Sequence, residues 1–271
     1  MKMQVLVSAV NESPEELAER MNLQTEAIII NQCDGFSHKE FQHRNKKIVC
    51  YNFAERGVGL SRNNALMRAD GDICLFSDED IVLHEGYEEK IREEFVRQPQ
   101  ADIIFFNVKV HPDRATYYNR KSKRIRWYNY GRYPMYSVCA RTAALHHSGV
   151  TFSLLFGGGA KYSNGEDSLF LHDCLKKGLR LYATDVLIGE ETYRESTWFR
   201  GYTKKFFYDR GFLYHYLYGV MERPFALRFL LANKNHMCNE IPVQDAYRLM
   251  KRGMKEAKSR IHHVWAENEE D

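Results

Sequence analysis

The stretch that decides the fold is "DICLFSDEDIVL", residues 72–83, in which an apolar run is broken by acids. Its first half has the length and composition of a buried strand, and Asp78, Glu79 and Asp80 follow where that strand would end. Adjacent carboxylates repel one another and are costly to remove from water, so a partner must compensate them. A divalent cation, a helix N-terminus or exposure to water could each do so, and the stretch alone leaves all three open.

The segments around this stretch alternate between short apolar runs and helical patterns. The runs that predict strands are at residues 4–10, 26–31, 47–52, 72–77, 102–110 and 180–188. The patterns that predict helices are at residues 13–21, 59–69, 87–97, 138–147 and 166–177. This alternation predicts an α/β fold with a mostly parallel sheet that helices flank on both faces. Ligands of such sheets bind beyond the carboxyl ends of the strands, which is where the three acids fall.

The composition is that of a folded globular chain, with 271 residues, 44% of them hydrophobic. The formal charge of +3 is too small to indicate a nucleic-acid partner, and we expect none. No apolar run approaches the roughly 20 residues of a membrane span. Six cysteines are scattered without a C-x-x-C pair, which predicts free thiols in a reducing compartment and hence a cytoplasmic location.

Beyond residue 190 the sequence changes to basic and aromatic segments and a long final helix. Apolar residues in that helix recur at spacings of three and four, a seam of about three heptads. The seam comprises Val243, Tyr247, Met250, Met254, Ala257, Ile261 and Val264. We expect it to pack on the protein's own domain, while a homo-oligomer through this helix and contact of its basic flank with anionic lipid stay open. A basic, aromatic stretch at residues 111–136 predicts a loop or hairpin.

Two constellations near the expected sheet edge could bind a ligand. On a strand, Asp78 and Asp80 point to the same side, and paired carboxylates together with substrate phosphates suit Mg²⁺ or Mn²⁺. The stretch "RGVGLSRNNAL", residues 56–66, follows the third strand and opens a helix. Its glycines and Arg62 could meet a diphosphate at the helix start. A solvated run of acids and an ordinary strand-to-helix turn are the alternatives.

A third constellation, "YSNGEDSLFLHDCLKKG" at residues 162–178, leads from a glycine-rich loop into a helix. Ser163 and Glu166 fit a capping box, so Glu166 could simply cap this helix. Asp167 also lies in the first turn, where acids suit the helix dipole. A carboxylate on a rigid helix start can remove a proton from an incoming hydroxyl. We assign the base to Asp167, and a capping or acceptor-holding role to Glu166.

Taken together, "VSAVNES", "IIINQCDG", "RGVGLSRNNALMRADGDICLFSDEDIVL" and "NGEDSLFLHDCLKKGLRL" resemble, in their order and spacing, family 2 glycosyltransferases of the GT-A fold. The resemblance covers about residues 3–190. It implies a GT-A (Rossmann-like) domain over residues 1–195 that binds a nucleotide-sugar and catalyses transfer. Residues 196–271 are then a mainly helical extension for acceptor, membrane or oligomer contacts. The Q-x-x-R-W signature of processive synthases is absent, which favours transfer of a single sugar.

The resemblance also implies a reaction. A UDP-sugar is the expected donor, a hydroxyl of a glycan or of a lipid-linked molecule the acceptor, and Mn²⁺ or Mg²⁺ the cofactor. The aromatic and basic C-terminal third of the sequence is what suggests a lipid-linked acceptor, which would bring the enzyme to the cytoplasmic face of the membrane. Asp80, with Asp78, is implied to hold the metal, and Asp167, beside Glu166, to deprotonate the acceptor with inversion at the sugar.

Further residues are implied to contact the nucleotide-sugar. They are Val10, Asn11, Glu12, Asn31, Gln32, Asp34, Arg62, Asn63, Asp78 and Glu79. The chain departs from the family pattern at Asn31-Gln32, where many relatives carry an Asp. Many relatives also have a late His as a metal ligand, where this chain reads "IGEETYREST". Glu190, Glu191 or water would fill that position.

Two alternatives belong to other classes of protein. A nucleotide-dependent oxidoreductase is suggested because Gly57-x-Gly59 follows a strand, opens a helix and precedes acids by about 20 residues. Its third glycine position is Arg62, however, and the motif follows the third strand instead of the first. A degenerate, non-catalytic transferase fold that binds a glycan is the other alternative. The acids at 78, 80 and 167 are all present, which argues against it.

Overall fold

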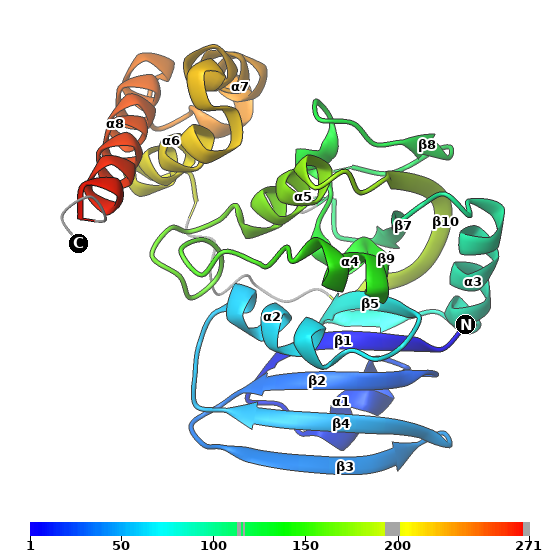
Figure 1. Ribbon diagram of the computed structural model, residues 1–271. Coiled ribbons are helices and arrows are strands. Elements are labelled where there is room, and N and C mark those ends of the chain that lie inside the picture. Colours follow the sequence, from blue (N-terminus) through cyan, green and yellow to red (C-terminus); the bar gives the residue numbers. More distant parts are fainter. Residues whose placement is uncertain (113–114, 116, 193–200, 268–271) are drawn as a thin grey trace. The chain divides into compact units, whose positions relative to one another are not determined.

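The computed structural model of the chain describes residues 1–112, 115, 117–192 and 201–267, with side chains up to residue 260. The chain forms two compact units (Figure 1). Unit 1 comprises residues 1–154 and 166–195, and unit 2 comprises residues 155–165 and 196–271. The domain boundary expected between residues 195 and 196 lies outside the described residues.

Unit 1 is built on a ten-stranded sheet with the order β3-β4-β2-β1-β5-β9-β7-β10-β6, and β8 also pairs with β10. Its parallel strands are β1 (Met3–Val10), β2 (Glu26–Gln32), β4 (Lys46–Phe53), β5 (Ile73–Asp78), β7 (Ile103–Lys109) and β10 (Leu181–Glu191). The strands with antiparallel partners only are β3 (Ser37–His43), β6 (Ile81–Leu83), β8 (Lys123–Arg124) and β9 (Val138–Arg141). The six strands predicted from the sequence are all present.

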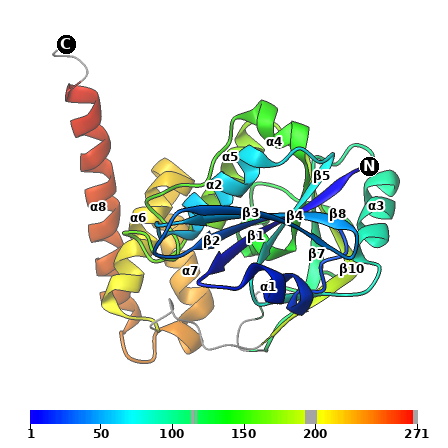
Figure 2. The ribbon, with the colours of Figure 1, turned by 90° about the horizontal axis from the view of Figure 1, so that it is seen from below.

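Helices cover both faces of this sheet, as Figure 2 shows for α1 on one side and α2 and α4 on the other. One face packs on α1 (Pro14–Arg20) and α3 (Tyr87–Arg97). The other packs on α2 (Val58–Arg68), α4 (Thr142–Ser148) and α5 (Glu166–Lys176). Alternate residues of β1 enter the two cores, since Val5 and Val7 lie in the first and Leu6 in the second. The predicted α/β fold is confirmed.

Four of the ten strands were not predicted, namely β3, β6, β8 and β9, and the reasons are clearest for β9 and β3. Residues 138–147 were expected to be one helix, but Val138–Arg141 form β9, antiparallel between β5 and β7, and α4 begins only at Thr142. The prediction was wrong because a short apolar run reads equally well as a buried strand or a buried helix. Strand β3 was not predicted, because its residues are almost all exposed and polar and give no alternating signal. It joins β4 through Arg44 and Asn45, which both have positive φ, as a type I′ hairpin turn requires.

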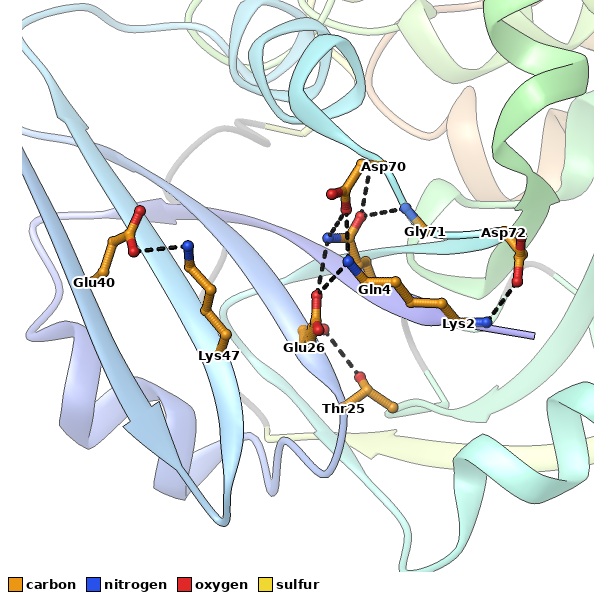
Figure 3. A network of polar contacts seen from close by, with 9 residues as sticks. All are labelled: Lys2, Gln4, Thr25, Glu26, Glu40, Lys47, Asp70, Gly71 and Asp72. Atoms are coloured by element: carbon orange, nitrogen blue, oxygen red, sulfur yellow. Dashed lines mark hydrogen bonds and ion pairs between the residues drawn. The ribbon is translucent and has the colours of Figure 1, made fainter.

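The amino edge of the sheet is held by polar contacts around Gln4 and Lys2 (Figure 3). The Gln4 side-chain oxygen accepts hydrogen bonds from the backbone N–H groups of Asp70 and Gly71, at 2.9 and 2.8 Å. Its amide nitrogen donates to the Asp70 carboxylate at 2.6 Å. The Lys2 ammonium lies 3.0 Å from Glu26 and 3.1 Å from Asp70. These contacts fix the turn that leads from α2 into β5.

Short 3₁₀ turns connect β8 to β9. They are η1 (Tyr130–Arg132) and η2 (Met135–Ser137). The expected loop or hairpin at residues 111–136 therefore contains β8 and both turns, with residues 113, 114 and 116 outside the description. Tyr130 and Met135 are buried, so the segment is anchored on the unit 1 core.

Unit 2 contains α6 (Lys204–Tyr218), η3 (Gly219–Met221), α7 (Glu222–Met237) and α8 (Val243–Glu267). Helices α6 and α8 approach closely at two glycines. A Cβ on Gly211 would lie 2.0 Å from the backbone oxygen of Met250, and a Cβ on Gly253 would lie 2.1 Å from the backbone oxygen of Tyr208. The described part of the apolar seam is thereby packed within unit 2, with Met250 and Ala257 fully buried. The expectation that the seam packs on the protein itself is confirmed there. Among the described residues, no helix has both the length and the apolar character that crossing a bilayer requires.

Candidate active site

The carboxyl ends of four parallel strands meet at one edge of the unit 1 sheet. The strand pairing sets Val10 beside Gln32, Gln32 beside Phe53, and Ser8 beside Asp78. The polar turns that follow β1, β2, β4 and β5 therefore lie next to one another. This is the edge at which ligands of parallel sheets bind.

Arg62 on α2 joins carboxylates from distant parts of the sequence at this edge. Its guanidinium donates to Asp167 at 2.6 Å and to Asp78 at 3.1 Å, and it lies 3.6 Å from Glu166. The arginine side chain is only 6% exposed. The structure thus brings together β5, α2 and α5 in one cluster, although Asp167 is 105 residues from Arg62 in the chain. We call these four residues the Arg62 cluster.

The start of α2 is positioned by its glycines and by an asparagine. Gly57 precedes the helix with φ of 131°, a conformation that favours glycine. A Cβ on Gly59 would lie 2.6 Å from the backbone oxygen of Ser153, so only glycine permits this packing. The Asn63 side chain accepts from the Phe152 N–H at 2.7 Å and donates to the Phe152 oxygen at 2.9 Å. The Asn63 amide is therefore used in fixing α2 to the loop before residue 154, and its contact with a nucleotide stays a prediction.

Burial sets the electrostatics of the Arg62 cluster. Burial and, after it, the neighbouring Asp167 charge raise the pKa of Glu166 to about 7, although Arg62 opposes the change. Burial also raises the pKa of Asp167, again against the effect of Arg62. For Arg62 itself burial disfavours the charge, but the carboxylates of Asp167 and Asp78 outweigh it and raise its pKa. Three carboxylates around one guanidinium leave an excess of negative charge, which favours a bound proton or a cation.

Tyr136 on η2 is a member of the site that the sequence did not indicate. Burial raises the pKa of its phenol, and four carboxylates raise it further, those of Glu191, Asp78, Asp167 and Asp80. The backbone N–H of the preceding residue, Met135, donates to Asp167 at 3.1 Å. Tyr136 comes from a loop without a motif, so no pattern in the sequence could have singled it out.

Asp80 and Glu191 lie at the junction of β6 and β10. Glu191 pairs with Ile81, and the backbone N–H of Thr192 donates to the backbone oxygen of Asp80 at 2.7 Å. Glu190 instead lies 3.6 Å from Lys109 on a well-exposed surface. Of the two glutamates considered as a replacement for the missing histidine, Glu191 is therefore the one close to the acids.

The side chains that are predicted to contact the nucleotide base are held in place by hydrogen bonds between strand ends. The Asn31 amide bonds both backbone groups of Glu12, at 3.0 and 2.9 Å, and the Asn52 side chain at 2.8 Å. The Gln32 side-chain oxygen accepts from the Gly57 N–H at 2.7 Å. These amides shape the edge of the sheet, and their contact with a base stays a prediction.

The remaining predicted residues lie around the same edge. Glu79 accepts from the Val10 N–H at 2.6 Å, which ties the end of β1 to the turn after β5. Asn11 follows with φ of 52°. Asp34 is exposed and pairs with Arg56 at 2.8 Å. The Glu12 carboxylate pairs with Arg20 at 2.8 Å, and its contact with a nucleotide-sugar stays a prediction.

The donor set at this edge fits a magnesium or manganese ion that shares its ligands with a phosphate. In the part of the chain that the structure describes, no three His, Cys, Asp or Glu side chains gather as a metal site of their own. Mg²⁺ commonly takes only one or two carboxylates and completes its shell with substrate phosphates and water. Asp78 and Asp80, both oxygen donors near an excess of negative charge, meet that requirement.

Comparison with known proteins identifies the family. A search of curated proteins finds no match. Among solved structures, S. aureus TarS 1–349 in complex with UDP-GlcNAc is similar with a TM-score of 0.61 and 16% identity, over 89% of this chain and 74% of that one. S. aureus TarS is similar with a TM-score of 0.59 and 15% identity, over 90% of this chain and 46% of that one. At these identities the likeness shows the fold, a GT-A-like one, as expected.

The sequence model described as glycosyl transferase family 2 matches residues 6–156, more than half of the chain. This match overturns the oxidoreductase alternative and agrees with the acids gathered at the carboxyl edge. The chain therefore belongs to glycosyl transferase family 2, enzymes that transfer a sugar from a nucleotide-sugar donor.

Proposed function

We propose that this enzyme is a metal-dependent, inverting glycosyltransferase that moves one sugar from a UDP-sugar to a hydroxyl of a glycan or lipid-linked acceptor. The observation that carries the proposal is the Arg62 cluster, which joins Asp78 of β5 to Asp167 of α5 at the ligand-binding edge. The donor UDP is favoured because TarS, a structural neighbour, is described in complex with UDP-GlcNAc. Transfer of a single sugar is favoured by the absent Q-x-x-R-W sequence.

Asp78 and Asp80 would hold Mn²⁺ or Mg²⁺. When bound, the metal supplies positive charge that stabilises the leaving nucleoside diphosphate. The buried guanidinium of Arg62 lies 3.1 Å from the Asp78 carboxylate and fixes its orientation. Asn11, Glu12, Asn31, Gln32 and the other predicted nucleotide contacts would line the pocket beside it.

Asp167 would act as the base. One of its carboxylate oxygens bonds Arg62 and the other accepts from the Met135 N–H, so its orientation is fixed before substrate arrives. Burial raises its pKa, which makes it a better proton acceptor than an exposed aspartate. It would take the proton of the acceptor hydroxyl as that oxygen attacks the anomeric carbon from the side opposite the diphosphate, which inverts the configuration.

Glu166 would hold the acceptor hydroxyl. Because burial raises its pKa to about 7, this carboxyl can carry a proton and donate a hydrogen bond near neutrality. The C-terminal region, residues 196–271, would contribute to acceptor binding. The six cysteines are free thiols, which suits the expected cytoplasmic location.

Calorimetry of UDP binding with and without Mn²⁺, combined with a transfer assay, tests the proposal. We expect UDP to bind the wild-type protein more tightly with Mn²⁺, and a panel of UDP-sugars to identify the donor. If neither UDP nor any other nucleoside diphosphate bound with or without metal, the proposal would be wrong.

A further inference from the structure

The segment between β7 and β9 carries an unusual charge. Residues 114–165 contain no Asp or Glu, although the whole chain has 36 of them. Within residues 117–133 there are six basic residues: Arg120, Lys121, Lys123, Arg124, Arg126 and Arg132. We call residues 117–133 the basic hairpin. This concentration of one charge is far from the near-neutral balance of the chain as a whole.

The basic hairpin also presents aromatic rings to solvent. Trp127 is 65% exposed, Tyr128 61% and Tyr118 52%. The basic residues Arg120, Lys121, Arg124, Arg126 and Arg132 are exposed among them. Exposed rings beside exposed cations match the interface of a bilayer, where aromatic side chains lie at the level of the headgroups and basic ones meet anionic lipid.

The surface is held in place by buried contacts, unlike a flexible basic tail. The Asn107 amide donates to the Asn119 oxygen at 2.9 Å, and the Asn119 N–H donates to the Asn107 side chain at 2.8 Å. Ile125 is 1% exposed, and its N–H donates to the Leu181 oxygen at 2.8 Å. In Figure 1 the green hairpin that contains β8 lies at the outer edge of unit 1, beyond β10. Because these contacts fix the segment on unit 1, its exposed side chains can meet a flat surface together.

The basic hairpin lies close in sequence to a residue that contacts the candidate base. Only two residues lie between Arg132 and Met135, whose N–H donates to Asp167, and three steps of extended chain span about 10 Å. A bilayer against the hairpin would therefore lie close to the carboxylate that receives the acceptor's proton. An acceptor anchored in that bilayer would have its hydroxyl near the site.

We propose that residues 117–133 form a docking surface for an anionic lipid bilayer, which brings a lipid-linked acceptor to Asp167. This deepens the proposed function and rests on it for the identity of the acceptor. A soluble polyanion would be attracted by the cations as well, but it gives no account of Trp127 and Tyr128 standing exposed in water.

Sedimentation with vesicles tests this surface. The probes are vesicles of phosphatidylcholine alone and of phosphatidylcholine with phosphatidylglycerol, at low salt. Each basic side chain near an anionic bilayer is worth about fivefold in partitioning. We expect the variant Arg120→Gln, Lys121→Gln, Arg124→Gln, Arg126→Gln to lose at least about 100-fold in binding to the anionic vesicles. Equal binding of this variant and the wild type would overturn the proposal.

A matched control has the same change of charge on α8: Lys251→Gln, Arg252→Gln, Lys255→Gln, Lys258→Gln. All four are exposed, and we expect this variant to bind anionic vesicles within about threefold of wild type, because binding would then depend on the hairpin and little on net charge. If the control variant lost binding and the hairpin variant did not, the membrane contact would be on α8, and the proposal for residues 117–133 would be wrong.

The aromatic residues separate a bilayer from a soluble polyanion. Trp127→Ser with Tyr128→Ser should weaken vesicle binding at least tenfold and leave binding to inorganic polyphosphate unchanged. Full vesicle binding by this variant would show a polyanion site and contradict the lipid proposal. UDP binding, measured by calorimetry on every variant, should stay at the wild-type value. A wild type that binds vesicles and not UDP would refute the proposed function while leaving the surface in place.

Discussion

The two edges of the unit 1 sheet each hold one cation among three acids, but they differ in burial. At the amino edge, Lys2 lies near Glu26, Asp70 and Asp72, with the Lys2 and Asp70 side chains 44% and 69% exposed. At the carboxyl edge, Arg62 is 6% exposed, and its acidic partners are between 14% and 31% exposed. Both edges set one glutamate and two aspartates beside one basic residue, a lysine at one edge and an arginine at the other, and the largest difference between them is burial.

The pKa values move in opposite directions at the two edges. The hydrogen bond from Lys2 lowers the pKa of Asp70, as expected for an exposed ion pair. Burial raises the pKa of Glu166 and Asp167 although Arg62 is beside them. Perturbed carboxyls at a ligand-binding edge are typical of functional sites, which supports the proposed roles of Glu166 and Asp167, whereas the contacts at the amino edge tie strands together. Desolvation is the largest cause of the raised pKa values at the carboxyl edge.

The largest effect is expected from the base. Asp167→Asn should lower the rate of sugar transfer by about 10²–10⁴, the contribution typical of a general base, while UDP binding changes little. Its counterpart Asp70→Asn at the amino edge should transfer at the wild-type rate. A steady-state transfer assay with calorimetry checks both. An Asp167→Asn enzyme with near-normal turnover would contradict the assignment of the base.

The next effect concerns the two cations. Arg62→Met leaves buried carboxylates without their partner and should lower the free energy of unfolding at pH 8 by about 3–5 kcal/mol. Lys2→Met at the exposed edge should lower it by less than about 1 kcal/mol. Urea denaturation measures both. Equal losses would mean that burial does not separate the two edges.

A smaller effect is expected for the metal site. Asp80→Ala should remove the strengthening of UDP binding by Mn²⁺ and leave the metal-free affinity unchanged, because the variant lacks one of the two oxygen donors. Asp72→Ala, at the opposite edge, should respond to Mn²⁺ like the wild type. Calorimetry with and without Mn²⁺ gives the answer, and an undiminished metal response in Asp80→Ala would exclude Asp80 as a ligand.

The smallest effect is a stability change that depends on pH. The pKa of Glu166 is raised from an ordinary 4.5 to about 7. The contribution of its protonated carboxyl to the free energy of unfolding is therefore full below pH 4.5 and is lost as the pH rises through 7. Glu166→Gln should therefore raise the free energy of unfolding relative to wild type at pH 8, by about 1–3 kcal/mol, and change it little at pH 4.5.

Asp70 should show the opposite sign. The pKa of Asp70 is lowered in the folded protein. The contribution of its carboxylate to the free energy of unfolding is therefore present above the ordinary pKa of an aspartate and is lost as the pH falls. Asp70→Asn should therefore cost stability at pH 8 and little at low pH. Urea denaturation of both variants at the two pH values makes the comparison, and a Glu166→Gln protein less stable than wild type at pH 8 would refute the assigned direction.

The sequence predicted the strands with continuous apolar runs, because a buried parallel strand needs them on both faces. It failed at β9, whose three apolar residues fit a helix equally well, and at β3, whose edge position needs no apolar pattern. The acids of the site were visible as motifs. Tyr136 was not, because it reaches the site through the packing of η2, which depends on long-range contacts.

The role of Arg62 shows the same limit. The sequence placed it beside a diphosphate, from its position at a helix start. The structure adds the hydrogen bonds of Arg62 to Asp78 and Asp167. These bonds require the start of α5 to lie near the end of β5, which the tertiary packing decides. Spacing within a motif gives the local element, but partners more than a hundred residues apart follow only from the fold.

The open sheet of unit 1 also has a consequence for self-association. An unpaired edge strand can recruit a strand from another molecule and start a fibril. Here one end of the sheet is β3, whose exposed residues include Lys39 and Glu40, and the other is β6, only three residues long. The charged residues of β3 and the short length of β6 make both strands poor partners for a strand of another molecule. A concentrated solution of this enzyme should therefore resist aggregation through its sheet.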